Sequence, residues 1–85
     1  MPIYHFNVED GVSLPDEDGY ELPDLETAKR SAVSLAGELI RERAAEFWKD
    51  PDWRLSVTDA AGGELFALQF TGVMGPAIQP PPGAV

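Results

Sequence analysis

The sequence predicts a small α+β domain: an antiparallel β-sheet of three or four strands with one long amphipathic helix packed on one face. The predicted order is strand, short optional strand, helix, strand, strand. Three observations predict it. Apolar and polar residues alternate at both ends of residues 1–71, apolar residues with a helical period occupy the middle, and Gly, Pro and Asp mark the turns between them. The chain has 85 residues and no cysteine, so we expect one core stabilised by packing alone.

The first strand is expected over residues 2–8, which are rich in aromatic and β-branched types and place alternate residues on one side of the pleat: Tyr4, Phe6 and Val8. Asp10-Gly11 closes this strand, because Asp-Gly readily adopts the positive φ of a tight turn. Asp18-Gly19 predicts a second such turn. Between and after these turns, residues 12–14 and 19–22 are at best short extended pieces.

The helix is expected to begin at Asp24 and to end at Asp50-Pro51. Pro23 holds the preceding residue in an extended conformation, and the Asp24 carboxylate can cap the first turn. The apolar stripe has a period close to 3.6 residues: Leu25, Ala28, Ala32, Leu35, Leu39 and Phe47, widened by Ala36 and Ile40. Gly37 lowers helix propensity, and we expect it to mark a close approach to the sheet.

A β-hairpin is expected after the helix. Its strands are residues 53–58 and 64–71, joined by a turn over residues 59–63, and its apolar face comprises Trp53, Leu55, Val57, Phe66, Leu68 and Phe70. Leu65 and Ala67 make the opposite face less polar than a solvated sheet usually is. Residues 72–85 are rich in Gly and Pro and predict a flexible or polyproline tail, so the expected domain spans residues 1–71.

The charge distribution is strongly acidic. Fifteen Asp and Glu against six Lys and Arg give a net charge of −9, which opposes direct binding to nucleic acid and to anionic membranes. No apolar run is long enough for a membrane span or a signal peptide, so we expect a cytoplasmic protein. The acids gather in an N-terminal stretch without Lys or Arg, which we call the acidic lobe: Glu9, Asp10, Asp16, Glu17, Asp18, Glu21, Asp24 and Glu26.

No motif in the sequence predicts catalysis, a metal centre or a cofactor. An EF-hand alignment that places Gly19 at the loop glycine puts Leu14 and Leu25 at ligand positions, so residues 16–19 indicate a solvated turn, with divalent-cation binding as the alternative. His5 is the single histidine, so the chain has no second histidine to share a metal site with it and no cysteine for it to activate. We therefore expect a protein that is not an enzyme and carries no metal or cofactor.

Trp48 and Trp53 flank the connection between the helix and the hairpin. Both are expected to cap the core at one end. The alternative is that one of them anchors a partner, because exposed tryptophan is common at the energetic centres of interfaces.

Residues 1 to about 71 resemble a small bacterial family of uncharacterised domains that is common in alphaproteobacteria. The resemblance rests on residues 1–7 followed by Asp10-Gly11, on residues 16–26 with their acid-acid-Gly-x-Glu-Leu-Pro-Asp signature, and on the hairpin segments 57–59 and 63–66. It implies a short α/β domain with no assigned activity, substrate or cofactor. The Asp-Gly-Tyr turn and the Pro-Asp-Leu segment are also similar to antitoxin-like domains of the HicB type, without their DNA-binding extension.

The leading functional hypothesis is a non-enzymatic protein–protein interaction module that binds another protein or itself as a homodimer. The binding surface is expected on the acidic lobe or on the open face of the sheet, and the candidate residues are Asp10, Asp16, Glu17, Asp18, Glu21, Leu65 and Ala67. One alternative is an acidic inhibitor or nucleic-acid mimic that occupies a basic groove of its partner. Another is a small antitoxin-like regulatory protein.

Overall fold

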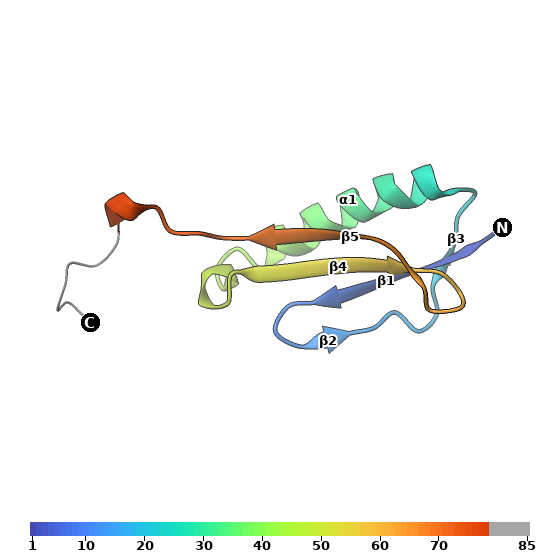
Figure 1. Cartoon of the computed structure of the whole chain (residues 1–85), viewed down its shortest axis with the longest axis horizontal. Coiled ribbons are helices and arrows are strands. Elements are labelled where there is room, and N and C mark those ends of the chain that lie inside the picture. Colours follow the sequence, from blue (N-terminus) through green and yellow to red (C-terminus); the bar gives the residue numbers. More distant parts are fainter. Residues whose placement is uncertain (79–85) are drawn as a thin grey trace.

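Five strands and one long helix make up residues 1–78, the part of the chain that the computed structural model describes (Figure 1). The α+β class predicted from the sequence is confirmed. In chain order the elements are β1 (Ile3–Glu9), β2 (Ser13–Leu14), β3 (Tyr20–Glu21), α1 (Leu25–Glu42), a 3-10 turn (Phe47–Lys49), β4 (Asp52–Thr58), β5 (Glu64–Thr71) and a second 3-10 turn (Pro76–Ile78).

The sheet is antiparallel, with the strand order β2-β1-β4-β5. β2 and β3 pair with the same edge of β1. β3 pairs with the first half of β1, and β2 pairs with its second half. The sheet has five strands because the two short extended pieces expected before the helix both pair with β1. β1 and β4 therefore form the centre of the sheet, and β5 forms the opposite edge.

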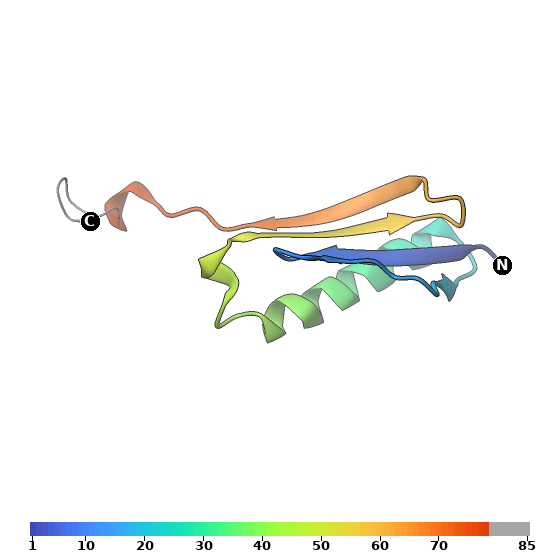
Figure 2. The same cartoon turned by 90° about the horizontal axis from the view of Figure 1, so that it is seen from below.

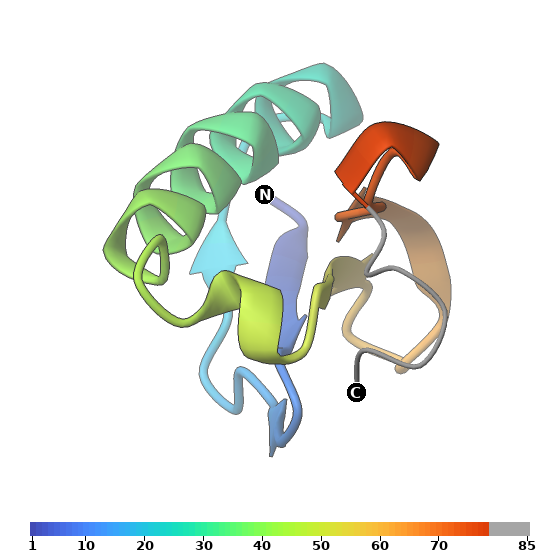
Figure 3. The same ribbon diagram turned by 90° about the vertical axis from the view of Figure 1, so that its left-hand side faces the viewer.

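The core lies between α1 and one face of the sheet (Figures 2 and 3). Trp53, Leu55 and Val57 of β4 are almost completely buried there. The helix faces them with three alanines, Ala28, Ala32 and Ala36, which are at most 1% exposed. Small side chains allow the helix backbone to approach the sheet, so the large side chains of the core come mostly from the strands. Tyr4 and Phe6 of β1 complete the core.

The helix ends at Glu42, which corrects the prediction that it continues to Asp50. Eighteen residues span about 27 Å, which matches strands of seven to eight residues at about 23–27 Å. A helix over residues 25–50 would be about 39 Å long and would leave its last turns with no sheet to cover. Bonds to Arg43 O from the N–H groups of Glu46 and Phe47 instead turn the chain toward β4.

Two expectations for the helix surface were wrong. Leu25 is 42% exposed, because it lies at the first helical position, beyond the buried row of alanines. Gly37 is exposed, and a Cβ built on it would meet no atom within 4 Å, so it marks no close approach to the sheet. The N-cap prediction was correct, since the Asp24 carboxylate accepts from the backbone N–H of Thr27 at 2.8 Å.

The predicted turn glycines adopt the left-handed backbone that the sequence requires. Gly11 has φ of 101° and Gly19 has φ of 74°. At the C-terminus, residues 72–75 have no regular structure, whereas Pro76–Ile78 form a 3-10 turn that was not expected in a polyproline tail. The expected proline-rich stretch from Gln79 onward lies outside the described residues. Within residues 1–78, no helix is both long enough and apolar enough to cross a membrane.

Candidate interaction surface

Asp16, one of the predicted binding residues, joins the loop between β2 and β3 to β1. Its carboxylate accepts from the backbone N–H of Phe6 at 3.1 Å and from that of Gly19 at 3.0 Å. Its own N–H donates to Asn7 Oδ1 at 2.9 Å. Its carbonyl oxygen lies 2.7 Å from His5 Nδ1, and because a carbonyl only accepts, Nδ1 carries the hydrogen. All the polar groups of Asp16 are thus engaged within the protein.

This carboxylate replaces a missing piece of edge strand. On the edge of β1 that carries β2 and β3, no backbone among residues 1–78 pairs with the middle of the strand, and the N–H of Phe6 points into that gap. Phe6 is only 7% exposed, so an unpaired N–H there would be costly. The Asp16 carboxylate satisfies it and gives this acid a structural role.

The remaining acids of the lobe separate into paired and unpaired groups. Asp10 forms an ion pair with Arg43 at 3.3 Å, which ties the first turn of the sheet to the end of α1. Glu17, Asp18 and Glu21 are exposed, and within residues 1–78 none of them forms a hydrogen bond or an ion pair through its side chain. Together with Glu9, which is likewise exposed and unpaired within residues 1–78, these carboxylates are the part of the predicted acidic lobe that remains available to a partner.

The predicted residues Leu65 and Ala67 lie on β5, at the edge of the sheet. Leu65 is 42% exposed and is the extra residue of a β-bulge, because Val57 pairs with Phe66 while Thr58 pairs with Glu64. Ala67 pairs with Ser56 on the face away from the helix. The sequence correctly predicted the position of Ala67 on the face opposite Phe66 and Leu68, but it contained no signal for the bulge at Leu65.

Backbone hydrogen bonds determine which groups of β5 point outward. The N–H of Gly72 donates to Pro51 O at 2.9 Å, so this pair is hydrogen-bonded, and in an antiparallel ladder every second pair behaves alike. Phe70 and Leu68 therefore direct their backbone groups to β4. Ala67 and Gln69, which alternate with them, direct their N–H and C=O groups to the outer edge. No strand pairs with that edge among residues 1–78.

An ion pair covers the open face next to this edge. Arg54 donates to Glu64 at 2.9 Å, and in the register of the hairpin the two side chains must span the Ser56–Ala67 pair. Ser56 is consequently only 7% exposed although it faces away from α1. The hydrogen bond from Arg54 lowers the pKa of Glu64 and raises the pKa of Arg54. The two charges are therefore paired with each other on the open face of the sheet.

The two tryptophans differ, which corrects the expectation that both cap the core. Trp53 is 1% exposed and packs edge to face on Phe70, with ring centroids 5.9 Å apart. Trp48 is 58% exposed because it lies in the 3-10 turn beyond the end of α1. Its ring packs on Gly72, where a Cβ would lie 2.7 Å from Trp48 Cζ3. Only Trp48 retains the exposure that a partner anchor needs.

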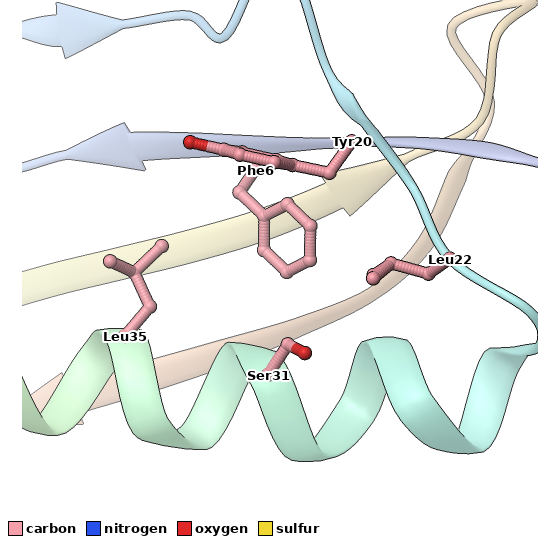
Figure 4. Close-up of a pocket in the computed structure, with 5 residues that line it drawn as sticks. All are labelled: Phe6, Tyr20, Leu22, Ser31 and Leu35. Carbon is pink, nitrogen blue, oxygen red and sulfur yellow. The ribbon is translucent and has the colours of Figure 1, made fainter.

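The surface carries small pockets, one beside the helix and one at the start of β4. One of about 260 Å³ lies between α1 and β3, and Figure 4 shows Ser31 and Leu35 pointing from the helix toward Phe6, Tyr20 and Leu22. A second, of about 280 Å³, is lined by three acids from separate parts of the chain, Glu9, Asp50 and Asp52, together with Arg54. Within residues 1–78, no group of three or more His, Cys, Asp or Glu side chains is placed to hold a metal ion.

Comparison with known proteins identifies a family but no activity. Residues 3–71 match the model of the family described as Domain of unknown function (DUF6894). No curated protein and no solved structure matches the chain. The matched segment begins with β1 and ends with the last residue of β5, so it contains the whole sheet and α1. The chain therefore belongs to the DUF6894 family.

Proposed function

We propose that this chain is a non-enzymatic protein–protein interaction module that forms a homodimer by pairing the β5 edges of two copies. One observation carries the proposal. The outer edge of β5 presents the backbone groups of Ala67 and Gln69 without a partner among residues 1–78, and no residue from Leu65 to Thr71 is charged. Sheet edges that must stay unpaired usually carry charges, prolines or a covering element.

A second copy is the partner that fits this edge best. Two molecules of net charge −9 repel each other, so they approach most easily where each surface is neutral. An antiparallel pair centred on Leu68 places Ala67 opposite Gln69 of the other copy, and both residues direct their backbone groups outward. The same register places Phe66 opposite Phe70, a favourable aromatic pair. Phe70 is 40% exposed in the single chain and would lose exposed surface on pairing.

Sedimentation velocity over a wide concentration range tests this proposal. We expect the wild-type protein to shift from monomer to dimer, and we expect Ala67→Lys to stay monomeric because it adds a lysine beside the pairing edge. Val33→Lys is the matched control, since Val33 is 61% exposed on the outer side of α1. A wild-type protein that stays monomeric throughout, or equal dimerisation of the two variants, would contradict the proposal.

Salt distinguishes this dimer from an acidic protein bound to a basic partner. Added salt screens the repulsion between two copies of charge −9, so the homodimer is expected to strengthen as ionic strength rises. A complex made through Glu17, Asp18 and Glu21 with a basic groove would weaken instead. We further propose that the protein acts in the bacterial cytoplasm, which fractionation of the source cells would test.

A further inference from the structure

The tripeptide Glu-Asp-Gly occurs twice, at residues 9–11 and 17–19, and both Asp-Gly steps lie outside the strands. An aspartate followed by glycine is prone to rearrange, because glycine has no side chain to hinder attack by its backbone nitrogen on the preceding carboxyl group. Since the three residues are identical, the intrinsic reactivities of the two steps are closely matched. A difference between them in the folded chain therefore reflects the surrounding contacts.

The rearrangement converts aspartate to isoaspartate and needs no reactant other than water. The glycine nitrogen bonds to Cγ of the aspartate and gives up its proton, while the carboxyl group loses one oxygen as water. Water then opens the resulting succinimide ring at the former main-chain carbonyl. The chain afterwards runs through Cγ, which lengthens the main chain by one atom.

At the Asp18-Gly19 step, a hydrogen bond holds the attacking nitrogen. The N–H of Gly19 donates to Asp16 Oδ1 at 3.0 Å, and a charged acceptor makes this a strong bond. Ring closure removes the proton, so the bond must break first. The Asp18 carboxyl is exposed and forms no hydrogen bond or ion pair within residues 1–78, so the obstacle to reaction lies at the nitrogen.

At the Asp10-Gly11 step, an ion pair holds the carboxyl group instead. Asp10 Oδ2 lies 3.3 Å from Arg43 Nη1, and the Asp10 side chain is only 16% exposed. Ring closure consumes this carboxylate, so the ion pair must break first. Gly11 is exposed, and its N–H donates no backbone hydrogen bond within residues 1–78. The obstacle to reaction therefore lies at the carboxyl group.

We propose that Asp10 and Asp18 are two sites of isoaspartate formation that the fold keeps unreacted, each through one contact: Asp10 with Arg43, and Gly19 with Asp16. Reaction at Asp10 lengthens the turn between β1 and β2, and reaction at Asp18 lengthens the loop before β3, so both disturb the same edge of the sheet. β5 is the opposite edge, so this inference is independent of the proposed dimer.

Incubation of the full chain in H₂¹⁸O at neutral pH tests the two sites, because ring opening leaves one ¹⁸O at each residue that has reacted. Tandem mass spectrometry then gives the rate at each aspartate. Arg43→Gln should accelerate the reaction at Asp10 alone, and Asp16→Ala should accelerate it at Asp18 alone. We expect an acceleration of about ten-fold or more, the factor by which a hydrogen bond to a charged group opposes opening.

The matched controls are Arg41→Gln and Glu21→Ala, which remove exposed charges that form no ion pair within residues 1–78 and should leave both rates unchanged. A variant that only unfolds more often would accelerate both sites together, so the crossed pattern separates the two contacts from a general loss of stability.

The wild-type chain gives a further measurement in case a variant fails to fold. Both sites should react slowly in the folded chain, and in concentrated urea they should react faster and at similar rates. Two results would overturn the proposal: absent or equal acceleration of the two sites in the folded variants, or a wild-type site that reacts as fast in the folded chain as in urea.

Discussion

Replacing Asp16 by alanine should destabilise the domain by about 2–3 kcal/mol. The substitution removes two hydrogen bonds, from the backbone N–H groups of Phe6 and Gly19 to the carboxylate, each with a net value of about 1–1.5 kcal/mol. The loss of the first bond leaves an unpaired N–H on a residue that is 7% exposed. For a domain of this size, such a loss lowers the melting temperature by roughly 10–20 °C.

Urea denaturation followed by circular dichroism measures this change, with Asp18→Ala as the matched control. Asp18 is two residues away and exposed, and its side chain forms no hydrogen bond within residues 1–78, so its removal should change stability by less than about 0.5 kcal/mol. Both substitutions remove one negative charge, so their difference isolates the hydrogen bonds. Equal unfolding midpoints for the two variants would refute the structural role assigned to Asp16.

Three further changes should affect stability in opposite directions. Gly37→Ala should stabilise the domain by up to about 1 kcal/mol in thermal denaturation, because Gly37 is exposed within α1 and a Cβ meets nothing within 4 Å. A less stable variant would contradict this reasoning. Gly19→Ala should destabilise it, because φ is 74° and the new Cβ would lie 2.6 Å from Ile3 Cγ2; an unchanged urea midpoint would contradict this steric reason. Glu64 has a lowered pKa in the folded chain. Its contribution to the free energy of unfolding is therefore complete above its unfolded pKa of about 4.3, and this contribution is lost as the pH falls through its pKa in the folded chain. Unfolding midpoints measured against pH should therefore fall less steeply in acid for Glu64→Gln than for the wild type, and parallel curves would exclude this linkage.

The sequence predicted the elements whose residues signal them locally. Asp24 after Pro23 marked the start of the helix, and the alternation around Trp53 and around Phe66 marked the hairpin and its faces. These signals are local because capping, turn formation and pleat alternation depend on neighbouring residues. The end of the helix was not predictable in this way. Glu42 is the last helical residue because the sheet that the helix covers ends there.

The candidate site was predictable only in part. Acidic residues can be counted in a sequence, but the count does not separate Asp10 and Asp16, which pair within the fold, from Glu17 and Asp18, which do not. Such pairings join residues that are up to 33 positions apart, as Asp10 and Arg43 are. The position of Ala67 on the open face of the sheet was predicted from the alternation, whereas the outward direction of the backbone at the edge required the hydrogen-bond register.

Amide hydrogen exchange at β5 tests the proposed dimer most directly. The amides of Ala67 and Gln69 point to the outer edge, whereas that of Leu68 points to β4. If β5 pairs with a second copy, the Ala67 and Gln69 amides should exchange quickly in dilute protein and become protected as the concentration rises. The Leu68 amide should be protected throughout. Rapid exchange of Ala67 and Gln69 at every concentration would contradict pairing of two β5 strands.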